Sequence, residues 1–224
     1  MMKSDYEKFA ISSGISSLSL HKYNQAMLPN AYINPTVLEE RELNVVGYDI
    51  FSRLMVDRII FLGDTIDSTL ANIINSQLLY LNSVGDDDIK IFINSPGGSV
   101  IDGLSIIDLI NFVKPDISTY CMGMCASMAS VLLSSGAKGK RYALPNSEIM
   151  LHQASGGTYG KNIDIQIAAK HIQRLQDKLY GILAQNCDKT FDEIAQAANN
   201  GDNWLDASGA VSFGLVDEII TKAK

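Results

Sequence analysis

Short apolar runs alternate with amphipathic stretches along most of the chain, and this alternation restricts its fold more than any other feature. Residues 58–63, 88–95 and 116–123 (RIIFLG, DIKIFINS and DISTYCMG) are rich in β-branched and aromatic side chains, which predicts buried strands. Apolar residues at spacings of three and four predict helices over residues 67–83 and 99–113, between these strands. Such a chain is expected to form an α/β fold with mainly parallel strands and right-handed crossovers.

The remaining segments continue this pattern. The helix over 163–186 is long for one small domain, so we expect its apolar stripe to meet another subunit; packing on its own sheet is the alternative. In the helix expected over 67–83, Asp67 or Ser68 is the expected N-cap. The expected buried stripe of this helix is Leu70, Ile73, Ile74, Leu78 and Leu81. We further predict an extended segment over 32–47, helices over 48–58, 126–137 and 190–199, two short strands within 140–153 and a last strand over 216–221.

The first 30 residues differ from the rest, because they are rich in Ser and Asn and have weak periodicity. We interpret them as a poorly ordered leader, followed by a single domain over residues 31–224. No apolar run reaches the roughly 18 residues that cross a bilayer, and the first residues lack the apolar core of a secretory signal. The sequence therefore predicts a cytoplasmic protein that does not bind membranes.

Charge and cysteine content exclude several classes of function. The formal net charge of −7, without clusters of Lys and Arg, argues against nucleic-acid binding. Three cysteines are too few and odd in number for a disulfide framework, and no nearby His completes a zinc site with Cys121 and Cys125. No glycine motif for nucleotide phosphates is present, so we expect neither a metal nor a nucleotide cofactor in this chain.

The search for a catalytic base is short, because the chain contains three histidines. His21 lies in the expected leader and His171 lies within the long helix. His152 lies where a strand opens into a loop rich in glycine, which is the usual place for active-site groups in α/β folds. His152 is therefore the candidate base, although a structural role for this histidine remains the alternative.

A nucleophile for this base is available at Ser127, where the strand over 116–123 gives way to a helix. The first N–H groups of a helix lack intrahelical partners, so the Met128 N–H could stabilise an oxyanion. Gly97 and Gly98 follow a second strand and could supply another donor. The G-x-S-x-G elbow of α/β-hydrolases is absent, and packing of a small residue remains the alternative for Ser127.

Three segments closely resemble the ClpP family, the proteolytic subunits of ATP-dependent Clp proteases. These are INSPGGSV at 93–100, the stretch over 114–157 that contains GMCASMAS and MLHQASGG, and VSFGLVDEII at 211–220. The similarity extends from about Tyr48 to Ile220, with matching order and spacing. The resemblance implies a crotonase-like α/β fold of repeated strand–helix units, with a protruding handle helix at about 160–187. It also implies two stacked heptameric rings around a chamber for unfolded polypeptides.

The resemblance also implies roles for individual residues. It makes the chain a serine endopeptidase with Ser127 as nucleophile, His152 as base and Asp202 as the group that orients the base. From the residues alone, four other aspartates remained equally good candidates: Asp188, Asp192, Asp206 and Asp217. The implied oxyanion donors are the N–H groups of Gly98 and Met128, and the implied substrate-binding edge consists of Gly97, Ser155, Gly156 and Gly157.

The implied partner is an AAA+ unfoldase of the ClpX, ClpA or ClpC type, which would consume the ATP itself. Phe92 matches the pocket that receives the unfoldase loops, whereas Lys90 falls where the family often has an aromatic residue. The sequence also departs from the family just before Asp202. Asn200 and Gly201 replace an acidic–basic pair that helps couple ring contact to the triad, and a small insertion lies between His152 and Asp202. We therefore expect ring pairing to rely on other contacts.

Two other functions are compatible with parts of this pattern. An inactive structural subunit of a mixed ring would have lost triad residues, but Ser127, His152 and Asp202 are all present. A crotonase-type acyl-CoA enzyme would share the fold and the backbone oxyanion donors, but it would normally use acidic catalytic residues. The sequence favours the protease over both.

Overall fold

The computed structural model describes residues 36–41 and 44–222. The chain divides after Ile50 into two compact units. In the first unit, β1 (Thr36–Arg41) and β2 (Asn44–Asp49) pair as an antiparallel ribbon, in keeping with the extended segment predicted there. The leader predicted over residues 1–30 lies outside the described residues.

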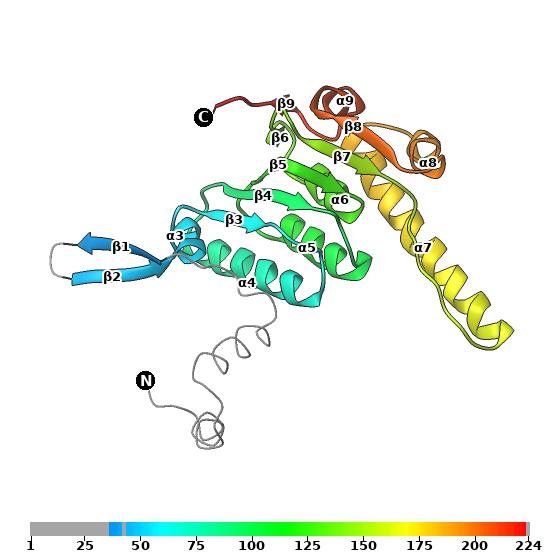
Figure 1. Ribbon diagram of the computed structural model, residues 1–224, viewed down its shortest axis with the longest axis horizontal. Coiled ribbons are helices and arrows are strands. Elements are labelled where there is room, and N and C mark those ends of the chain that lie inside the picture. The colour runs from blue at the N-terminus through cyan, green and yellow to red at the C-terminus, as the bar shows by residue number, and fades with distance from the viewer. Residues whose placement is uncertain (1–35, 42–43, 223–224) are drawn as a thin grey trace, which may run out of the picture. The chain divides into compact units, whose positions relative to one another are not determined.

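The second unit is built on a mixed sheet of seven strands, as far as the described residues show (Figure 1). The order β3-β4-β5-β6-β9 is parallel throughout, and β7 is a second parallel neighbour of β5. β8 runs antiparallel to β7. The strands are β3 (Ile59–Leu62), β4 (Ile89–Ser95), β5 (Ile117–Ala126), β6 (Arg141–Ala143), β7 (Glu148–Leu151), β8 (Asn203–Asp206) and β9 (Glu218–Ile219).

The long strand β5 brings the later strands to one edge. Its first half pairs with β6, from Thr119 to Cys121, and its second half pairs with β7, from Met124 to Ala126. Between the halves the register against β4 shifts, and Gly123 adopts a φ of 71°. A bulge of this kind re-aims the strand that follows it. The end of β5 is therefore delivered beside the end of β7.

Six of the seven helices in the described residues begin and end close to where the sequence predicts, and the helix over residues 207–213 was not predicted. Asp67 is the N-cap of α4, since its carboxylate accepts a hydrogen bond from the Leu70 N–H at 2.8 Å. Ile73, which we expected in the buried stripe, is half exposed, and Ala71 is buried in that turn instead. In Figure 1, α4 and α5 lie side by side along β3 and β4. The helices are α3 (Ile50–Val56), α4 (Ser68–Val84), α5 (Val100–Phe112), α6 (Met128–Ser134), α7 (Asn162–Cys187), α8 (Phe191–Asn199) and α9 (Ala207–Phe213).

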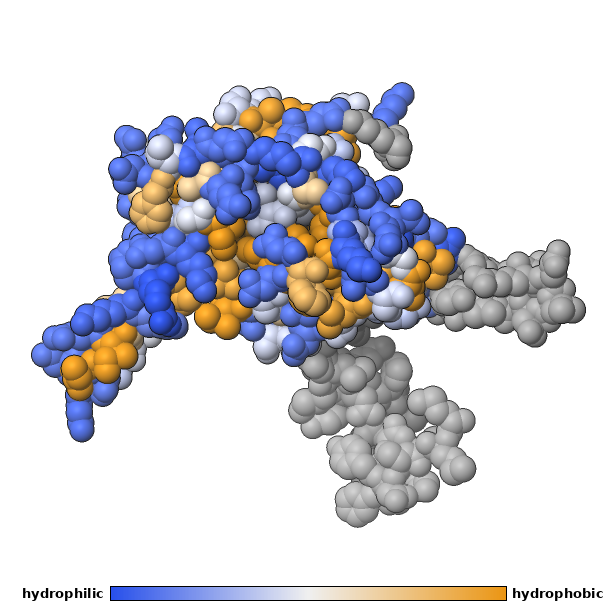
Figure 2. All heavy atoms as spheres, turned by 180° about the vertical axis from the view of Figure 1, so that it is seen from behind, coloured by the Kyte–Doolittle hydropathy of each residue, from blue (hydrophilic) through white to orange (hydrophobic). Residues whose placement is uncertain are grey.

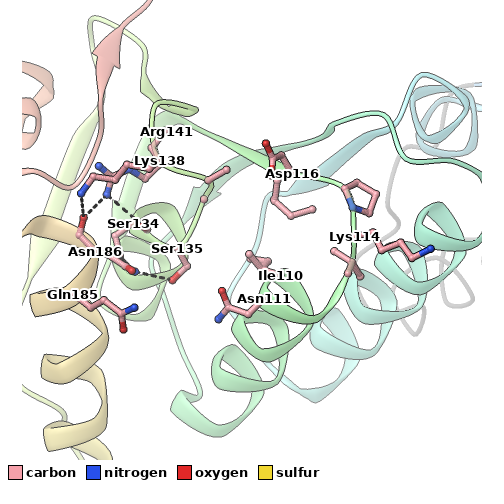
Figure 3. Close-up of a pocket in the computed structure, with 15 residues that line it drawn as sticks. Ile110, Asn111, Lys114, Asp116, Ser134, Ser135, Lys138, Arg141, Gln185 and Asn186 are labelled. Carbon is pink, nitrogen blue, oxygen red and sulfur yellow. Dashed lines mark hydrogen bonds between the residues drawn. The ribbon is translucent and has the colours of Figure 1, made fainter.

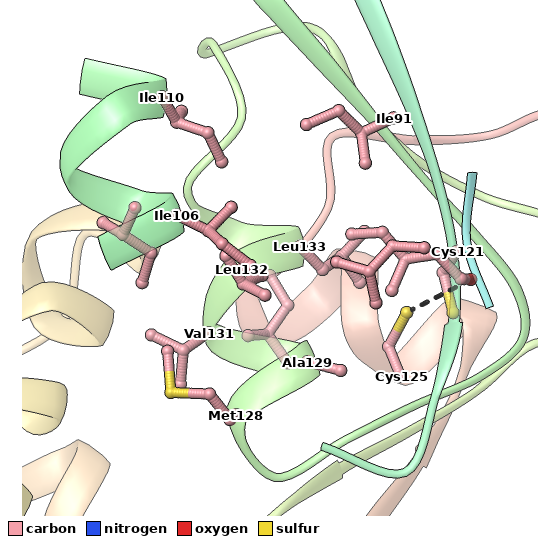
Figure 4. Packing of buried hydrophobic residues seen from close by; sticks show 14 of the residues in the cluster. Ile91, Ile106, Ile110, Cys121, Cys125, Met128, Ala129, Val131, Leu132 and Leu133 are labelled. Carbon is pink, nitrogen blue, oxygen red and sulfur yellow. Dashed lines mark hydrogen bonds between the residues drawn. The ribbon is translucent and has the colours of Figure 1, made fainter. Parts of the chain in front are cut away.

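The short helix α6 lies in the middle of the core. All seven of its residues are buried, and Figure 4 shows Leu132 and Leu133 packed among Ile106 of α5 and Ile91 of β4. Burial of such a side chain contributes about 1.5–3 kcal/mol. Because α6 is fixed on all sides, the residue that precedes it is also held rigidly.

Helix α7 is only half covered. Its buried residues lie in the C-terminal half and are Leu179, Tyr180, Leu183 and Cys187. The N-terminal half projects from the second unit as a handle (Figure 1), and hydrophobic side chains lie along this arm (Figure 2). Ile163 and Ile167 there are 58% and 60% exposed. The apolar stripe of α7 therefore extends beyond the part that packs on the chain's own sheet.

In the described residues, no helix is both long enough and apolar enough to cross a bilayer.

Candidate active site

Ser127 occupies a strained position between β5 and α6. Its φ of 55° and ψ of −123° are rarely adopted by a residue with a side chain, and such a conformation costs about 1–3 kcal/mol. The surrounding structure holds it, because the Ser127 N–H donates to the Met150 carbonyl of β7 at 2.9 Å. The side chain makes no capping hydrogen bond to α6, so its Oγ is free to face His152.

His152 directly follows β7. Since β5 and β7 are parallel neighbours with Ala126 opposite Met150, their C-terminal ends meet at one edge. His152 Nε2 lies 2.7 Å from Ser127 Oγ, which is hydrogen-bond distance. A serine and a histidine in this relation can act as nucleophile and general base.

Asp202 directly precedes β8. The antiparallel pairing of β8 with β7, which places Asn203 opposite Leu151, brings the Asp202 carboxylate to the far side of the imidazole. Asp202 Oδ1 lies 3.3 Å from His152 Nδ1, and the Asp202 side chain is 61% exposed. The structure thus brings the candidate nucleophile and base, Ser127 and His152, together with Asp202, the aspartate that the resemblance to ClpP implies.

The four rival aspartates lie in other environments. Asp206 caps α9, because its carboxylate accepts from the Gly209 N–H at 2.7 Å, and Asp192 lies in the first turn of α8. Asp188 is paired with Lys138, and Asp217 is paired with Arg141.

Two glycines shape the wall opposite Ser127. Gly97 has a φ of 91°, and a Cβ added there would lie 2.6 Å from the Ala126 carbonyl oxygen and 2.7 Å from Ser127 Cβ. Gly98 has a φ of 147°, and its Cβ would lie 2.2 Å from the Ile66 carbonyl oxygen. Only glycine fits at either position. Gly97, which we predicted to bind the substrate strand, is itself buried against the turn that contains Ser127.

Two backbone N–H groups are available near Ser127 Oγ. Ile66 donates to the Gly97 carbonyl and accepts from the Ser99 N–H, both at 2.8 Å, so the N–H of Gly98 between them points away from Ile66. Met128 is the first residue of α6, where an N–H has no intrahelical partner. Gly98 and Met128 line one small cavity with Ser127 and His152.

This cavity has a volume of about 50 Å³. Apolar and polar side chains both line it, and Ser155 of the loop after β7 is one of the polar ones. The predicted substrate-binding residues Ser155, Gly156 and Gly157 are exposed and belong to no strand or helix. The loop is fastened near its start, where the Ala154 N–H donates to Gln176 of α7 at 3.2 Å. The larger apolar and aromatic residues in this lining are Val100, Met128, Val131, Leu151, Leu179 and Tyr180.

Phe92 lies in a different cavity, of about 440 Å³, at the other end of the sheet strands. Its ring stacks on Tyr120 with a centroid separation of 4.5 Å, and Tyr120 stacks on Tyr142 at 4.9 Å. Lys90 and Ile220 also line this cavity. Three aromatic rings on neighbouring strands thus form an apolar floor, with the Lys90 side chain at its edge.

A third cavity, of about 410 Å³, is polar (Figure 3). Two of the three cations that line it are already paired, because Lys138 contacts Asp188 and the Arg141 guanidinium contacts Asp217 and the Asn186 carbonyl; the third is Lys114. No cluster of three or more His, Cys, Asp or Glu residues suited to a metal ion occurs in the described part of the chain.

The three cysteines are buried free thiols. Burial raises the pKa of the Cys187 thiol to about 11, with smaller opposing effects of nearby cations, so this thiol stays neutral. A neutral, buried thiol is unreactive, and a packing role accounts for Cys187.

The segment where the sequence departs from the ClpP pattern is a turn. The Asn200 side chain donates to the Gln196 carbonyl at 3.1 Å, and Gly201 adopts a φ of 101°. Neither residue carries a charge, so no ion pair is possible here.

Sequence reasoning overlooked two nearby residues, Tyr180 and Asn199, whose side chains are joined by a hydrogen bond of 2.8 Å. A tyrosine in the apolar stripe of a helix was the available signal, because a buried hydroxyl requires a partner.

Comparison with known proteins gives a consistent result. The family model described as Clp protease matches residues 41–223. The chain belongs to the Clp protease family. It is 48% identical over 220 residues to an "ATP-dependent Clp protease proteolytic subunit" of Bacteroides fragilis (strain YCH46), covering 97% of this chain and 99% of that protein. A protein of the same name from Porphyromonas gingivalis (strain ATCC BAA-308 / W83) is 44% identical over 220 residues, covering 97% and 98% of the two chains.

Membership in the Clp protease family confirms two predictions from the sequence. The α/β architecture is that of the ClpP/crotonase-like fold, and the enzyme class is serine endopeptidase. The alternative of a crotonase-type acyl-CoA enzyme is thereby set aside. Membership also implies association with Clp ATPases.

Proposed function

We propose that this chain is the proteolytic subunit of an ATP-dependent Clp protease and cleaves unfolded polypeptides with Ser127, His152 and Asp202. The proposal rests on the distance of 2.7 Å between Ser127 Oγ and His152 Nε2 at the meeting ends of β5 and β7. An inactive structural subunit would not need to maintain the strained backbone of Ser127.

The proposed reaction is acyl transfer through two tetrahedral intermediates. Ser127 Oγ attacks the peptide carbonyl carbon while His152 Nε2 takes the hydroxyl proton, and Asp202 stabilises the resulting imidazolium. The N–H groups of Gly98 and Met128 bind the oxyanion. His152 returns the proton to the leaving amine as the C–N bond breaks, and water then hydrolyses the acyl ester by the same route.

The substrate is proposed to bind as an extended strand along residues 153–157. This segment is exposed and irregular, so its backbone groups are accessible to a peptide. Hydrogen bonds to a peptide backbone are independent of sequence, whereas the cavity of about 50 Å³ would accept one side chain. Such a site suits a broad range of unfolded chains.

The proposed assembly consists of two stacked heptameric rings, with the protruding half of α7 between them. The uncovered isoleucines of this half, Ile163 and Ile167, support an interface with another copy. We further propose that a ClpX-, ClpA- or ClpC-type unfoldase consumes the ATP and that this chain binds no cofactor.

Covalent labelling tests the proposed mechanism. A fluorophosphonate probe should modify Ser127, because only a serine with a base within hydrogen-bond distance reacts readily. The adduct is mapped by mass spectrometry of the peptide that contains residue 127. Ser127→Ala should abolish labelling, His152→Ala should strongly reduce it, and Ser212→Ala, at an exposed serine of α9, should not change it. Labelling that persists in Ser127→Ala would exclude this mechanism.

A second experiment tests the proposed docking of the unfoldase at Phe92. Loss of an aromatic anchor from an interface typically costs at least about 2 kcal/mol, so Phe92→Ser should weaken unfoldase binding by about thirtyfold. ATP-dependent degradation of an unfolded protein should fall, whereas hydrolysis of a short peptide by the protease alone should not change. Phe92→Leu, which keeps an apolar side chain on Tyr120, should lose less. Equal ATP-dependent degradation by wild type and Phe92→Ser would place the docking site elsewhere.

A further inference from the structure

Tyr180 connects the active-site cavity to the segment that carries Asp202. Its side chain is 3% exposed and forms part of the cavity beside Ser127. The ring contacts Phe191 at the start of α8, with 5.7 Å between centroids, and the hydroxyl donates to Asn199 Oδ1 at the end of α8. One side chain of α7 thus holds both ends of α8.

The chemistry of Tyr180 suits a donor. Burial raises the pKa of the Tyr180 phenol above its usual range, and the nearby Asp177 carboxylate adds to this effect. The hydroxyl therefore stays protonated at neutral pH. The Asn199 amide oxygen accepts a hydrogen bond from this hydroxyl at 2.8 Å, and neither group changes its charge near neutral pH.

Asp202 has little else to hold it. Within residues 36–41 and 44–222, the Asp202 carboxylate is seen to contact His152, at 3.3 Å. Its side chain is 61% exposed. Upstream, two residues separate it from Asn199, and one of them is Gly201 with a φ of 101°. Three residues span at most about 10 Å, so fixing Asn199 restricts where Asp202 can lie. Downstream, the pairing of Asn203 with Leu151 fixes the other side.

We propose that Tyr180 is a positioning residue, whose hydrogen bond to Asn199 anchors the turn before Asp202 and so holds this carboxylate against His152. This inference rests on the proposed function, in which Asp202 orients the base. The same ring forms a wall of the cavity, so the hydroxyl and the ring have separable roles.

Tyr180→Phe in the full-length protein separates them, because it removes the hydroxyl and keeps the ring against Phe191. With a fluorogenic peptide we expect kcat to fall about tenfold, the fold-change that corresponds to the net contribution of one ordinary hydrogen bond, and KM to change by less than about twofold. Asn199→Ala should cause the same fall, and the double variant should fall no further, since both changes remove one bond. Asn199 is exposed, so truncating it should leave folding intact.

A spectroscopic measurement supports the kinetic one. Trp204 is the single tryptophan of the sequence and lies two residues after Asp202 in β8. If the turn loosens, the fluorescence anisotropy of Trp204 should fall in both variants. Tyr80→Phe, at a half-exposed tyrosine of α4, is the matched control and should change neither kcat nor anisotropy.

The outcomes separate this inference from the proposed function. If Asp202→Ala lowers kcat but Tyr180→Phe does not, the positioning role is wrong and the triad stands. A rise in KM with unchanged kcat would reduce Tyr180 to a cavity wall, and additive losses in the double variant would also overturn the proposal. If Asp202→Ala has no effect on kcat, the assignment of Asp202 itself fails.

Discussion

Replacement of Ser127 by alanine is expected to lower kcat for peptide hydrolysis by about a million-fold, the loss seen when the nucleophile of a serine protease triad is removed. The Oγ that lies 2.7 Å from His152 Nε2 disappears, and no other hydroxyl is positioned against this base in the described structure. The backbone donors at Gly98 and Met128 remain, so weak residual catalysis without a covalent intermediate is the most that should survive. The measurement is the initial rate with a fluorogenic peptide at saturating concentration.

The same substitution should leave the fold almost unchanged. Ser127 makes no capping hydrogen bond, and alanine experiences the same strain at a φ of 55°. Wild-type and variant protein should therefore unfold at nearly equal temperatures and assemble equally. Residual activity above about one thousandth of the wild-type rate, in protein free of wild-type contamination, would contradict a serine mechanism. Inactivity of the wild-type protein itself would instead favour the structural-subunit alternative.

Most of the fold could be predicted from the sequence, because its elements carry strong local signals. The β-branched runs and the helical stripes before β7 give the strands and helices of the second unit to within a few residues. Strand β8 and helix α9 were missed. The sequence NWLD of β8 has no β-branched residue, and its partner β7 lies about fifty residues earlier. A local signal for α9 did exist, because Asp206 is a favourable N-cap residue and its carboxylate accepts from the Gly209 N–H three residues later.

The site could be predicted only in part. Ser127 and His152 can be predicted from the sequence around them, since each lies where a strand ends beside glycine-rich sequence. Asp202 cannot be predicted in this way, because five aspartates were candidates. Strand β8 determines where Asp202 lies, and its sequence signal is weak. Tyr180 was hidden for a related reason: its partner Asn199 belongs to another helix, and a periodicity argument cannot identify a hydrogen bond between elements.

The buried pair of Arg141 and Asp217 should carry a large share of the stability. The Arg141 side chain is 3% exposed, and Asp217 accepts bonds from its Nε at 2.9 Å and from the Gly139 N–H at 2.8 Å, which fastens β6 to the segment before β9. Removing one partner of a buried pair typically costs about 3–5 kcal/mol, because the remaining charge is buried alone. We expect Asp217→Asn to reduce the free energy of unfolding by about 3 kcal/mol. Urea unfolding at one fixed protein concentration measures it.

Asp188→Asn is the matched control, because it removes the partner of Lys138 in a pair whose side chains are 58% and 77% exposed. Exposed pairs contribute about 0–1 kcal/mol, so this variant should behave almost like the wild type. Equal losses in Asp188→Asn and Asp217→Asn would show that burial is not the source of the effect. Small and equal effects in both would show that the Arg141 pair contributes little.

The pH dependence of this difference provides a sharper test. Burial alone would raise the pKa of Asp217, but hydrogen bonds from Arg141 and its positive charge outweigh burial and lower it. A carboxyl with a lowered folded-state pKa stabilises the protein above its unfolded pKa of about 3.9, and this contribution is lost as the pH falls through the folded value. The stability difference between wild type and Asp217→Asn should therefore be constant from about pH 5 to 7 and shrink below about pH 4. A difference that stays constant at low pH would mean that the negative charge of Asp217 is not what stabilises β6 against β9.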